Sequence, residues 1–207
     1  MPKKEVASFI SEIVPGFFHF MINDGIHFRR DCYAIVDSKK KETVLIDPLQ
    51  MDKKLYDLPK VKAIFLTAAC HQRKAWNYRK MLKAKVYAPK GKWFKGKPDY
   101  FLRDNMKLPG NVIAIHSPGP TDAHYSFYSK NSGGAIICGD LLVNEGRGNL
   151  KFVESQYQDN PDITRKSVKR LLGFDFKVLC FNHGPPMTKG AKKAIRKVLR
   201  EDNEFKD

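Results

Sequence analysis

Residues 61–73, VKAIFLTAACHQR, decide the fold that the sequence predicts. The first six are mostly apolar or β-branched, a composition typical of a buried strand. The last seven, TAACHQR, form a short loop of mixed chemistry, and a helical pattern with Ala75, Tyr78 and Leu82 on one face follows it. Because ligands of α/β proteins usually bind at loops that leave the carboxyl ends of strands, we expect chemistry in this loop.

Strand patterns lie on both sides of this stretch. Upstream, residues 16–22, 32–36 and 43–46 are predicted as strands, and an amphipathic piece at 51–58 leads back to residue 61. Downstream, strands are predicted at 85–88, 112–115, 125–128, 135–138 and 178–181. Asn160 and Pro161 mark the start of a helix, and a last amphipathic helix follows Thr188.

The loop after Leu66 and Thr67 resembles the signature loop of the metallo-β-lactamase superfamily. In that family a strand ending in Leu-Thr is followed by His-x-His-x-Asp-His, whose side chains hold one or two metal ions. The four corresponding positions here are occupied by Ala68, Cys70, Gln72 and Arg73. Of these side chains only the thiolate of Cys70 is a good metal ligand.

Three later turns carry the same resemblance. Pro120 follows Pro118-Gly119 at the position of a family metal-binding His, and proline has no ligand atom. Asp140 in Gly139-Asp140 matches the aspartate that bridges two metals in the family. His183 before Gly184 matches the family's closing His, and His124 is interpreted as a structural histidine.

The resemblance implies an α/β fold, a four-layer αββα sandwich, formed by residues 1–207 as a single metallo-β-lactamase-like domain. A length of 207 residues suits one domain. Six aliphatic positions in the predicted strands are expected to be buried: Ile64, Leu66, Ile113, Ile115, Ile136 and Leu179.

The missing ligands imply a degenerate metal site, and we expect a pseudoenzyme rather than a dinuclear metallohydrolase. No cofactor is expected, and the cleft is predicted to bind an anionic small molecule or partner. The candidate cleft residues are His71, Gln72, Arg73, Pro120, His124, Asp140 and His183. We further expect Arg73 to form an ion pair with Asp140 in the space that a metal would occupy.

A first alternative keeps the protein an enzyme. One Zn or Fe ion held by Cys70, Asp140 and His183 would serve hydrolysis of an ester, thioester or phosphodiester. His71 is the weaker candidate ligand, because the residue between two ligand positions normally points elsewhere.

Charge supports a second alternative, nucleic-acid binding through a basic surface. The chain has 38 Lys and Arg against 22 Asp and Glu, a formal net charge of +16. The basic aromatic loop at 89–101, with Trp93 and Phe94 among lysines, is interpreted as a surface loop. No recognised nucleic-acid-binding motif is present.

The four cysteines indicate a reducing compartment. Three of them (Cys32, Cys138 and Cys180) lie within apolar strand-like runs, which is typical of core thiols in a cytoplasmic protein and not of a disulfide framework. No signal peptide and no apolar run of membrane-spanning length is found in the sequence. The sequence leaves the oligomeric state and the substrate open.

Overall fold

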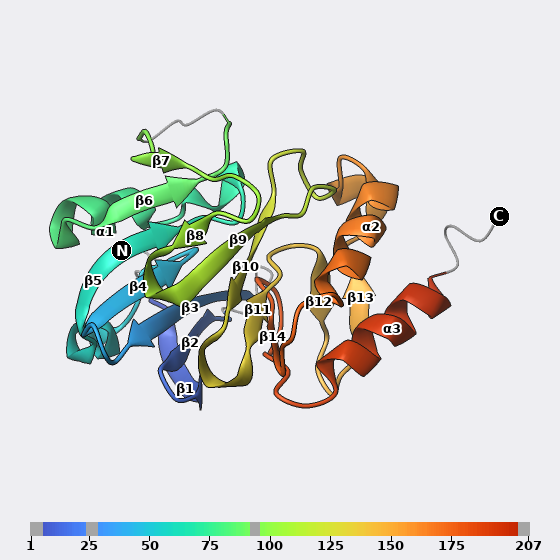
Figure 1. The fold of residues 1–207 in the computed structure, drawn as a ribbon, viewed down its shortest axis with the longest axis horizontal. Coiled ribbons are helices and arrows are strands. Elements are labelled where there is room, and N and C mark those ends of the chain that lie inside the picture. The colour runs from blue at the N-terminus through green and yellow to red at the C-terminus, as the bar shows by residue number, and fades with distance from the viewer. Residues whose placement is uncertain (1–5, 24–28, 92–95, 203–207) are drawn as a thin grey trace.

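A computed structural model describes residues 6–23, 29–91 and 96–202 of the chain. Two β-sheets face each other, and helices cover their outer surfaces (Figure 1). In the described residues the first sheet has the strand order β1 (Ser8–Val14), β2 (Phe17–Ile22), β3 (Arg30–Asp37), β4 (Glu42–Ile46), β5 (Lys60–Phe65), β6 (Lys85–Ala88) and β7 (Tyr100–Phe101). Strands β1 to β4 are antiparallel, whereas β4 to β7 run parallel.

The second sheet has the order β14 (Val178–Cys180), β11 (Ala135–Ile137), β10 (Tyr125–Ser129), β9 (Val112–His116) and β8 (Lys107–Leu108). Only the β11–β14 pair is parallel, and the other pairs are antiparallel. A separate hairpin is formed by β12 (Leu142–Asn144) and β13 (Leu150–Phe152). The carboxyl ends of β11 and β14 therefore point the same way, which brings the loops after these strands together.

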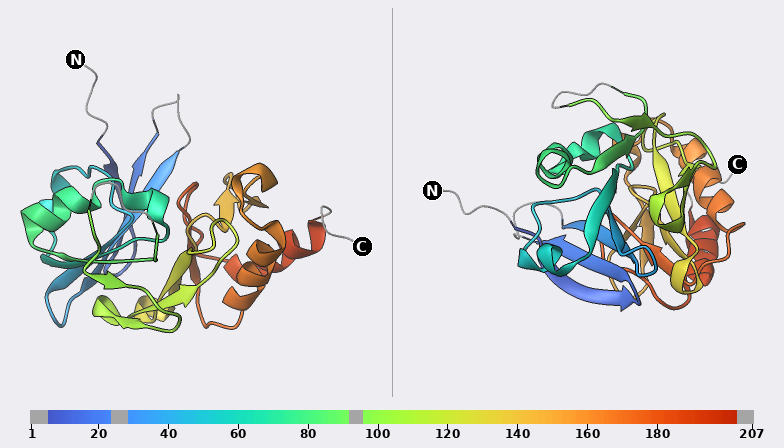
Figure 2. Two further views of the ribbon diagram at one scale, coloured as in Figure 1. Left: turned by 90° about the horizontal axis from the view of Figure 1, so that it is seen from above. Right: turned by 60° about the vertical axis from the view of Figure 1, so that its left-hand side comes forward.

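Three α-helices form the outer layers in the described residues. Helix α1 (Ala75–Leu82) lies on the first sheet, and α2 (Pro161–Leu171) and α3 (Ala191–Glu201) lie on the second (Figure 2). The side chain of Asn160 caps α2 by accepting a hydrogen bond from the Ile163 N–H, as predicted. Short 3₁₀ turns are η1 (Lys53–Asp57), η2 (Ala69–Gln72), η3 (Pro109–Asn111), η4 (Asn131–Gly133) and η5 (Ser155–Tyr157). None of the described helices has the length and apolar character needed to cross a membrane.

Three hydrophobic clusters correspond to the three interfaces between the layers. The middle cluster packs the two sheets together through residues such as Tyr33, Phe65 and Phe127. The outer clusters pack α1 onto the first sheet and α2 with α3 onto the second, around Tyr78 and Ile195 respectively. The expected four-layer αββα sandwich is therefore confirmed.

Five of the six aliphatic residues expected in the core are buried, but Ile113 is only partly so. It packs at the margin of the cluster beneath α2 and α3, next to the short edge strand β8. All four cysteines are free, and the three predicted as core thiols are fully buried. Trp93 and Phe94 of the basic loop lie outside the described residues, whereas Tyr100 and Phe101 at its end are exposed and form β7.

Tyr33 joins the two sheets by hydrogen bonds as well as by packing. Its hydroxyl donates to the carbonyl oxygen of Phe181 at 2.7 Å and accepts from the Phe181 N–H at 3.2 Å. Tyr33 lies on β3 of the first sheet, and Phe181 follows β14 of the second. The phenol is fully buried, and burial raises its pKa well above the usual value.

Replacing Tyr33 with Phe should therefore destabilise the fold by about 1–3 kcal/mol, because two buried backbone groups lose their partner. Chemical denaturation followed by circular dichroism measures this loss. The control is Tyr157→Phe, at a side chain that is 60% exposed and should change nothing measurable. Equal stability of Tyr33→Phe and the wild type would contradict this role.

Candidate functional site

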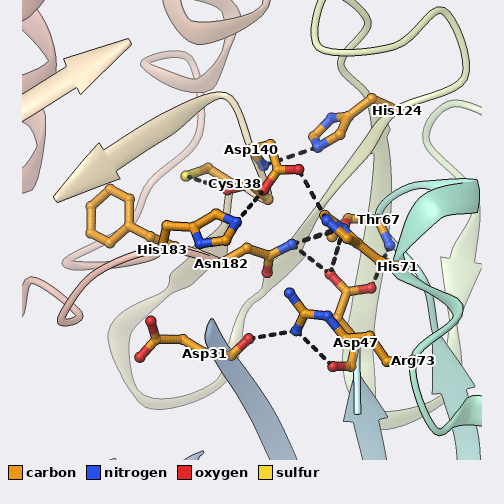
Figure 3. Close-up of polar contacts among 12 residues, drawn as sticks. Asp31, Asp47, Thr67, His71, Arg73, His124, Cys138, Asp140, Asn182 and His183 are labelled. Carbon is orange, nitrogen blue, oxygen red and sulfur yellow. Dashed lines mark hydrogen bonds and ion pairs between the residues drawn. The ribbon is translucent and has the colours of Figure 1, made fainter. Parts of the chain in front are cut away.

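Polar side chains from the loops that follow strands of both sheets come together at one place (Figure 3). Asp47 follows β4 and Thr67 follows β5 in the first sheet, while Asp140 follows β11 and His183 follows β14 in the second. The side chains of these loops face one another across the junction of the sheets. This is the place where the sequence predicts a cleft.

A buried carboxylate, that of Asp47, forms the base of the site. Its Oδ1 accepts from the Thr67 N–H at 2.9 Å, and its Oδ2 accepts from the Thr67 hydroxyl at 2.6 Å. The amide of Asn182 donates to Oδ2 at 2.8 Å. Burial alone would raise the pKa of Asp47, but the nearby His71 and Arg73 and these hydrogen bonds lower it below its usual value.

His71 lies between two carboxylates. Its Nε2 is 3.0 Å from Asp140 Oδ2, and its Nδ1 is 3.5 Å from Asp47 Oδ2 and 2.8 Å from the Thr67 hydroxyl. Burial alone would lower the pKa of His71. The carboxylates of Asp140 and Asp47 outweigh this effect and raise the pKa well above 6.5. The sequence predicts His71 as a cleft residue but as the weaker candidate ligand; the 3₁₀ turn η2 directs its ring toward Asp140.

Asp140 has one oxygen without a hydrogen bond. Oδ2 contacts His71, whereas Oδ1 is buried, has no hydrogen-bond partner among the described residues and lies 3.6 Å from His183 Nε2. Burial raises the pKa of Asp140, but His71, through its charge and its hydrogen bond, lowers it well below the usual range. The carboxylate is therefore ionised and directed toward His71 and His183.

The ring of His183 is oriented by the backbone. Its Nδ1 is 2.6 Å from the carbonyl oxygen of Arg29, and since a carbonyl can only accept, Nδ1 must carry the proton. Nε2 is then the nitrogen that faces Asp140. The fully buried Asp31 supports this arrangement, because its carboxylate accepts from the Gly184 N–H at 2.9 Å and pairs with Arg29 at 2.8 Å.

His124 has the structural role that the sequence predicts. It is fully buried, its Nδ1 donates to the Ser117 carbonyl at 2.9 Å, and its Nε2 accepts from the Asp140 N–H at 3.2 Å. Gly139 makes this approach feasible, because a Cβ there would lie 2.3 Å from His124 Nε2. The histidine thus fixes the backbone that presents the Asp140 side chain.

The predicted ion pair between Arg73 and Asp140 is wrong. Arg73 Nη1 instead donates to two backbone carbonyls, those of Asp31 at 2.8 Å and Asp47 at 3.0 Å. Arg73 has a positive φ of 39°, and its side chain lies against the start of β3 and the end of β4. His71, and not Arg73, is the cationic neighbour of Asp140.

Two other cleft candidates take no part in the polar contacts of this network. The Gln72 side-chain oxygen accepts from Trp76 Nε1 at 2.8 Å and is thereby held against α1. Pro120 is buried, and its carbonyl accepts from the Asp159 N–H at 3.3 Å. The structure brings together His71, His124, Asp140 and His183, but it does not bring Gln72 or Pro120 into their polar contacts.

Cys70 completes a group of possible metal ligands. Its Sγ, a ring nitrogen of His71 and a carboxylate oxygen of Asp140 all lie within 4.8 Å of one another. Cys70 is exposed, whereas the ring of His71 is buried. Sequence reasoning assigned no role to Asp47, Thr67 and Asn182, although the position of Asp47 at the end of a strand was a usable signal.

Because His124 is buried in its neutral form, we expect the protein to lose stability in acid. Burial lowers the pKa of His124 from 6.5 to about 4, so the unfolded chain takes up a proton at a higher pH than the folded protein does. Stability supplied by neutral His124 should be complete above pH 6.5 and should fall by up to about 3 kcal/mol as the pH drops to 4.

The variant His124→Gln isolates this contribution. It should be less stable than the wild type at pH 7, and the difference should shrink steadily toward pH 4 in denaturation experiments. Between pH 7 and 8 the difference should stay constant. A difference that is also constant from pH 7 to pH 4 would contradict the buried neutral state of His124.

Comparisons by sequence find nothing, since no protein-family model and no curated protein matches the chain. Comparisons by structure find many solved proteins. The DIM-1 metallo-β-lactamase exposed to ceftazidime has a TM-score of 0.74 at 12% identity, and the match covers 96% of this chain and 100% of that one. An archaeal metallo-β-lactamase superfamily protein from Sulfolobus tokodaii has a TM-score of 0.65 at 18% identity, covering 86% of this chain and 83% of that one.

ETHE1 from Myxococcus xanthus is similar to the same degree, with a TM-score of 0.64 at 18% identity over 90% of this chain and 91% of that chain. At identities this low, structural similarity establishes the fold only, and the chemistry has to be inferred from the residues of the site. The chain therefore adopts the metallo-β-lactamase fold, an α/β architecture of two mixed sheets with helices outside.

Proposed function

We propose that the cleft binds a single divalent transition-metal ion and that the protein is a hydrolase of esters, thioesters or phosphodiesters. The ligands would be Cys70, His71 and Asp140, with His183 beside them. The observation that carries the proposal is the convergence of a thiol, an imidazole and a carboxylate within 4.8 Å of one another. In this donor set His71 takes the place expected for His183, which lies next to Asp140 instead.

The donor atoms suit one ion of the size and chemistry of zinc. Ligand atoms around a tetrahedral zinc lie about 3–4 Å apart, given bonds of about 2.0–2.3 Å. His71 Nε2 and Asp140 Oδ2 are separated by 3.0 Å, and Asp140 Oδ1 and His183 Nε2 by 3.6 Å. The buried Asp140 Oδ1, which has no hydrogen-bond partner among the described residues, is an acceptor for which a cation would compensate.

Charge balance supports the same assignment. A thiolate at Cys70 and the carboxylates of Asp140 and Asp47 would supply three negative charges. A divalent ion and the guanidinium of Arg73, which lies near Asp47, would supply three positive ones. The loaded site would then be close to neutral, as a largely buried cluster requires.

The geometry gives less support to the anion-binding cleft that the sequence favours. Arg73 is the fixed cation on which that expectation depends, and its guanidinium is bound to two backbone carbonyls. The positive charge of His71 is balanced by the carboxylates of Asp140 and Asp47 on its two sides. A second metal ion is also disfavoured, because Ala68 and Pro120 occupy two of its ligand positions and offer no ligand atom.

When bound, the ion would polarise the substrate and lower the pKa of a water molecule. The residues of the chain would prepare the cleft for it. Thr67 and Asn182 fix the His71 ring, and the Arg29 carbonyl holds His183 with Nε2 toward Asp140. Since the proton on His71 Nε2 has to leave before that nitrogen becomes a ligand, metal binding should release protons.

One observation favours a second candidate, a metal-free protein. His71 and Asp140 are in direct contact at 3.0 Å and can neutralise each other without an ion. In that case the cleft would be a closed ion pair and the protein a pseudoenzyme. Metal stoichiometry separates the two candidates.

Metal binding is therefore the decisive test of this proposal. Purified protein stripped with a chelator and titrated with Zn²⁺ should take up about one equivalent. The isosteric change Asp140→Asn and the change His71→Gln should each reduce uptake to well under one equivalent. In protein loaded with Co²⁺, Cys70→Ser should remove the near-ultraviolet band of a thiolate bound to cobalt.

Matched controls are available elsewhere on the surface. Asp57→Asn and His116→Gln make the same chemical changes away from the cleft and should leave the stoichiometry unchanged. Circular dichroism checks that each variant is folded. A wild type that takes up no metal, or variants that bind as well as the wild type, would favour the pseudoenzyme.

Catalysis is tested separately from metal binding. Loaded wild-type protein should hydrolyse a simple ester, thioester or phosphodiester, and Asp140→Asn should lower kcat/KM by about a hundredfold or more. Asp57→Asn should leave kcat/KM unchanged. A stoichiometric ion without turnover of any of the three substrate classes would leave a metal-binding protein and refute the hydrolase.

A further inference from the structure

A groove lined with lysines lies far from the Asp140 cleft. A groove of about 820 Å³ is bounded by the β1–β2 turn, the β3–β4 turn, the β8–β9 segment and the turn before β11. Its lysines are Lys39, Lys40, Lys107 and Lys130. We call this feature the lysine groove. It is separate from the Asp140 cleft, because it shares no residue with it.

Strand directions place the lysine groove and the cleft at opposite ends of the sandwich. Strand β4 begins at Glu42, next to the turn that carries Lys39 and Lys40, and ends just before Asp47 of the cleft. Strand β11 likewise begins after the turn at Ser132 and ends before Asp140. A five-residue strand separates the two features by roughly 16 Å.

The four lysines of the groove have no charged partner among the described residues, whereas several other described lysines do. Lys62, Lys85 and Lys151 pair with acidic residues at 2.8 to 3.6 Å. In the described part of the chain, no ion pair or hydrogen bond is found for the ammonium groups of Lys39, Lys40, Lys107 and Lys130. Because three separate segments bring four cations without ion-pair partners to one groove, its positive potential should attract an anion.

The groove also contains a carboxylate, that of Asp37, but this group is engaged. Its Oδ1 accepts hydrogen bonds from the backbone N–H groups of Lys39 and Lys40, both at 3.1 Å. These bonds shape the turn and partly offset the negative charge. The lysine side chains remain available for a ligand.

Cross-connections between the sheets hold the groove in shape. The Ser132 hydroxyl donates to the Pro15 carbonyl at 2.7 Å and so joins η4 to the β1–β2 turn. Asn111 donates to Asn131 at 3.0 Å, which joins η3 to η4. A site held by such contacts needs little reorganisation when a ligand enters.

Size and lining point to a small ligand with several negative charges. A volume of about 820 Å³ suits a small molecule, since ligand pockets are usually about 300–1,000 Å³. The apolar part of the lining comes from Pro15, Val36, Leu108, Val112 and Ile113, and none of the described residues adds an aromatic side chain to it. Single-stranded nucleic acid needs aromatic stacking surfaces, which the groove lacks.

We propose that the lysine groove binds a multiply phosphorylated small molecule, with the lysines on its phosphates and the apolar lining on its body. Lysine ammonium groups bind phosphate as point charges. The proposal is independent of the chemistry proposed for the Asp140 cleft.

The test is calorimetric titration of the full chain at low salt with two probes, inorganic triphosphate and ATP. One molecule should bind per chain, and ATP should bind more tightly if the apolar lining contributes. The double change Lys107→Gln and Lys130→Gln should weaken binding by about tenfold or more, because each lysine loses a charged hydrogen bond. Asp140→Ala should not weaken it, which separates the groove from the cleft.

The matched control is the double change Lys189→Gln and Lys193→Gln, which removes the same charge at two exposed positions at the start of α3. It should alter the affinity by less than about twofold. Equal weakening by both double variants would mean diffuse attraction by the whole surface and would overturn the proposal. Absence of saturable binding would also overturn it, as would binding of a DNA duplex alone through the same lysines.

Discussion

The buried carboxylate of Asp47 is the interaction on which the site depends. It has no exposure to solvent, and its hydrogen-bond donors come from Thr67 after β5 and from Asn182 after β14. One carboxylate therefore ties together the ends of both sheets. Because a buried carboxylate without partners would cost several kcal/mol, this network forms only when the sheets are packed correctly. The position of His71 follows from it, since Thr67 and Asn182 also contact the ring.

Most of the fold could be predicted because its central strands carry strong local patterns. Strand β6, for example, has the bounds predicted from sequence, and Asn160 caps α2 as its position before Pro161 indicates. The strands that were missed are short or lie at edges. In β1 exposed and partly buried residues alternate, and β12 has only three residues, so neither shows a sustained apolar period.

The position of the site could be predicted from the sequence, but the directions of its side chains could not. Sequence order places Asp140 and His183 at strand ends, and the structure brings them to 3.6 Å. Sequence could not foresee which way Arg73 turns, because a positive φ at a non-glycine residue depends on the donors and acceptors around it. The bond between Asp47 and Asn182 spans 135 residues, a separation at which no local pattern carries information.

The bridge from Tyr33 to Phe181 has a consequence for how the molecule comes apart. The two sheets share one inner cluster, in which Tyr33 and Phe65 of the first half face Phe127 of the second. Pulling the sheets apart would expose this apolar surface and leave the phenol and two backbone groups without partners at the same moment. Unfolding should therefore be cooperative across both sheets, and neither half of the chain should persist as a native-like fragment.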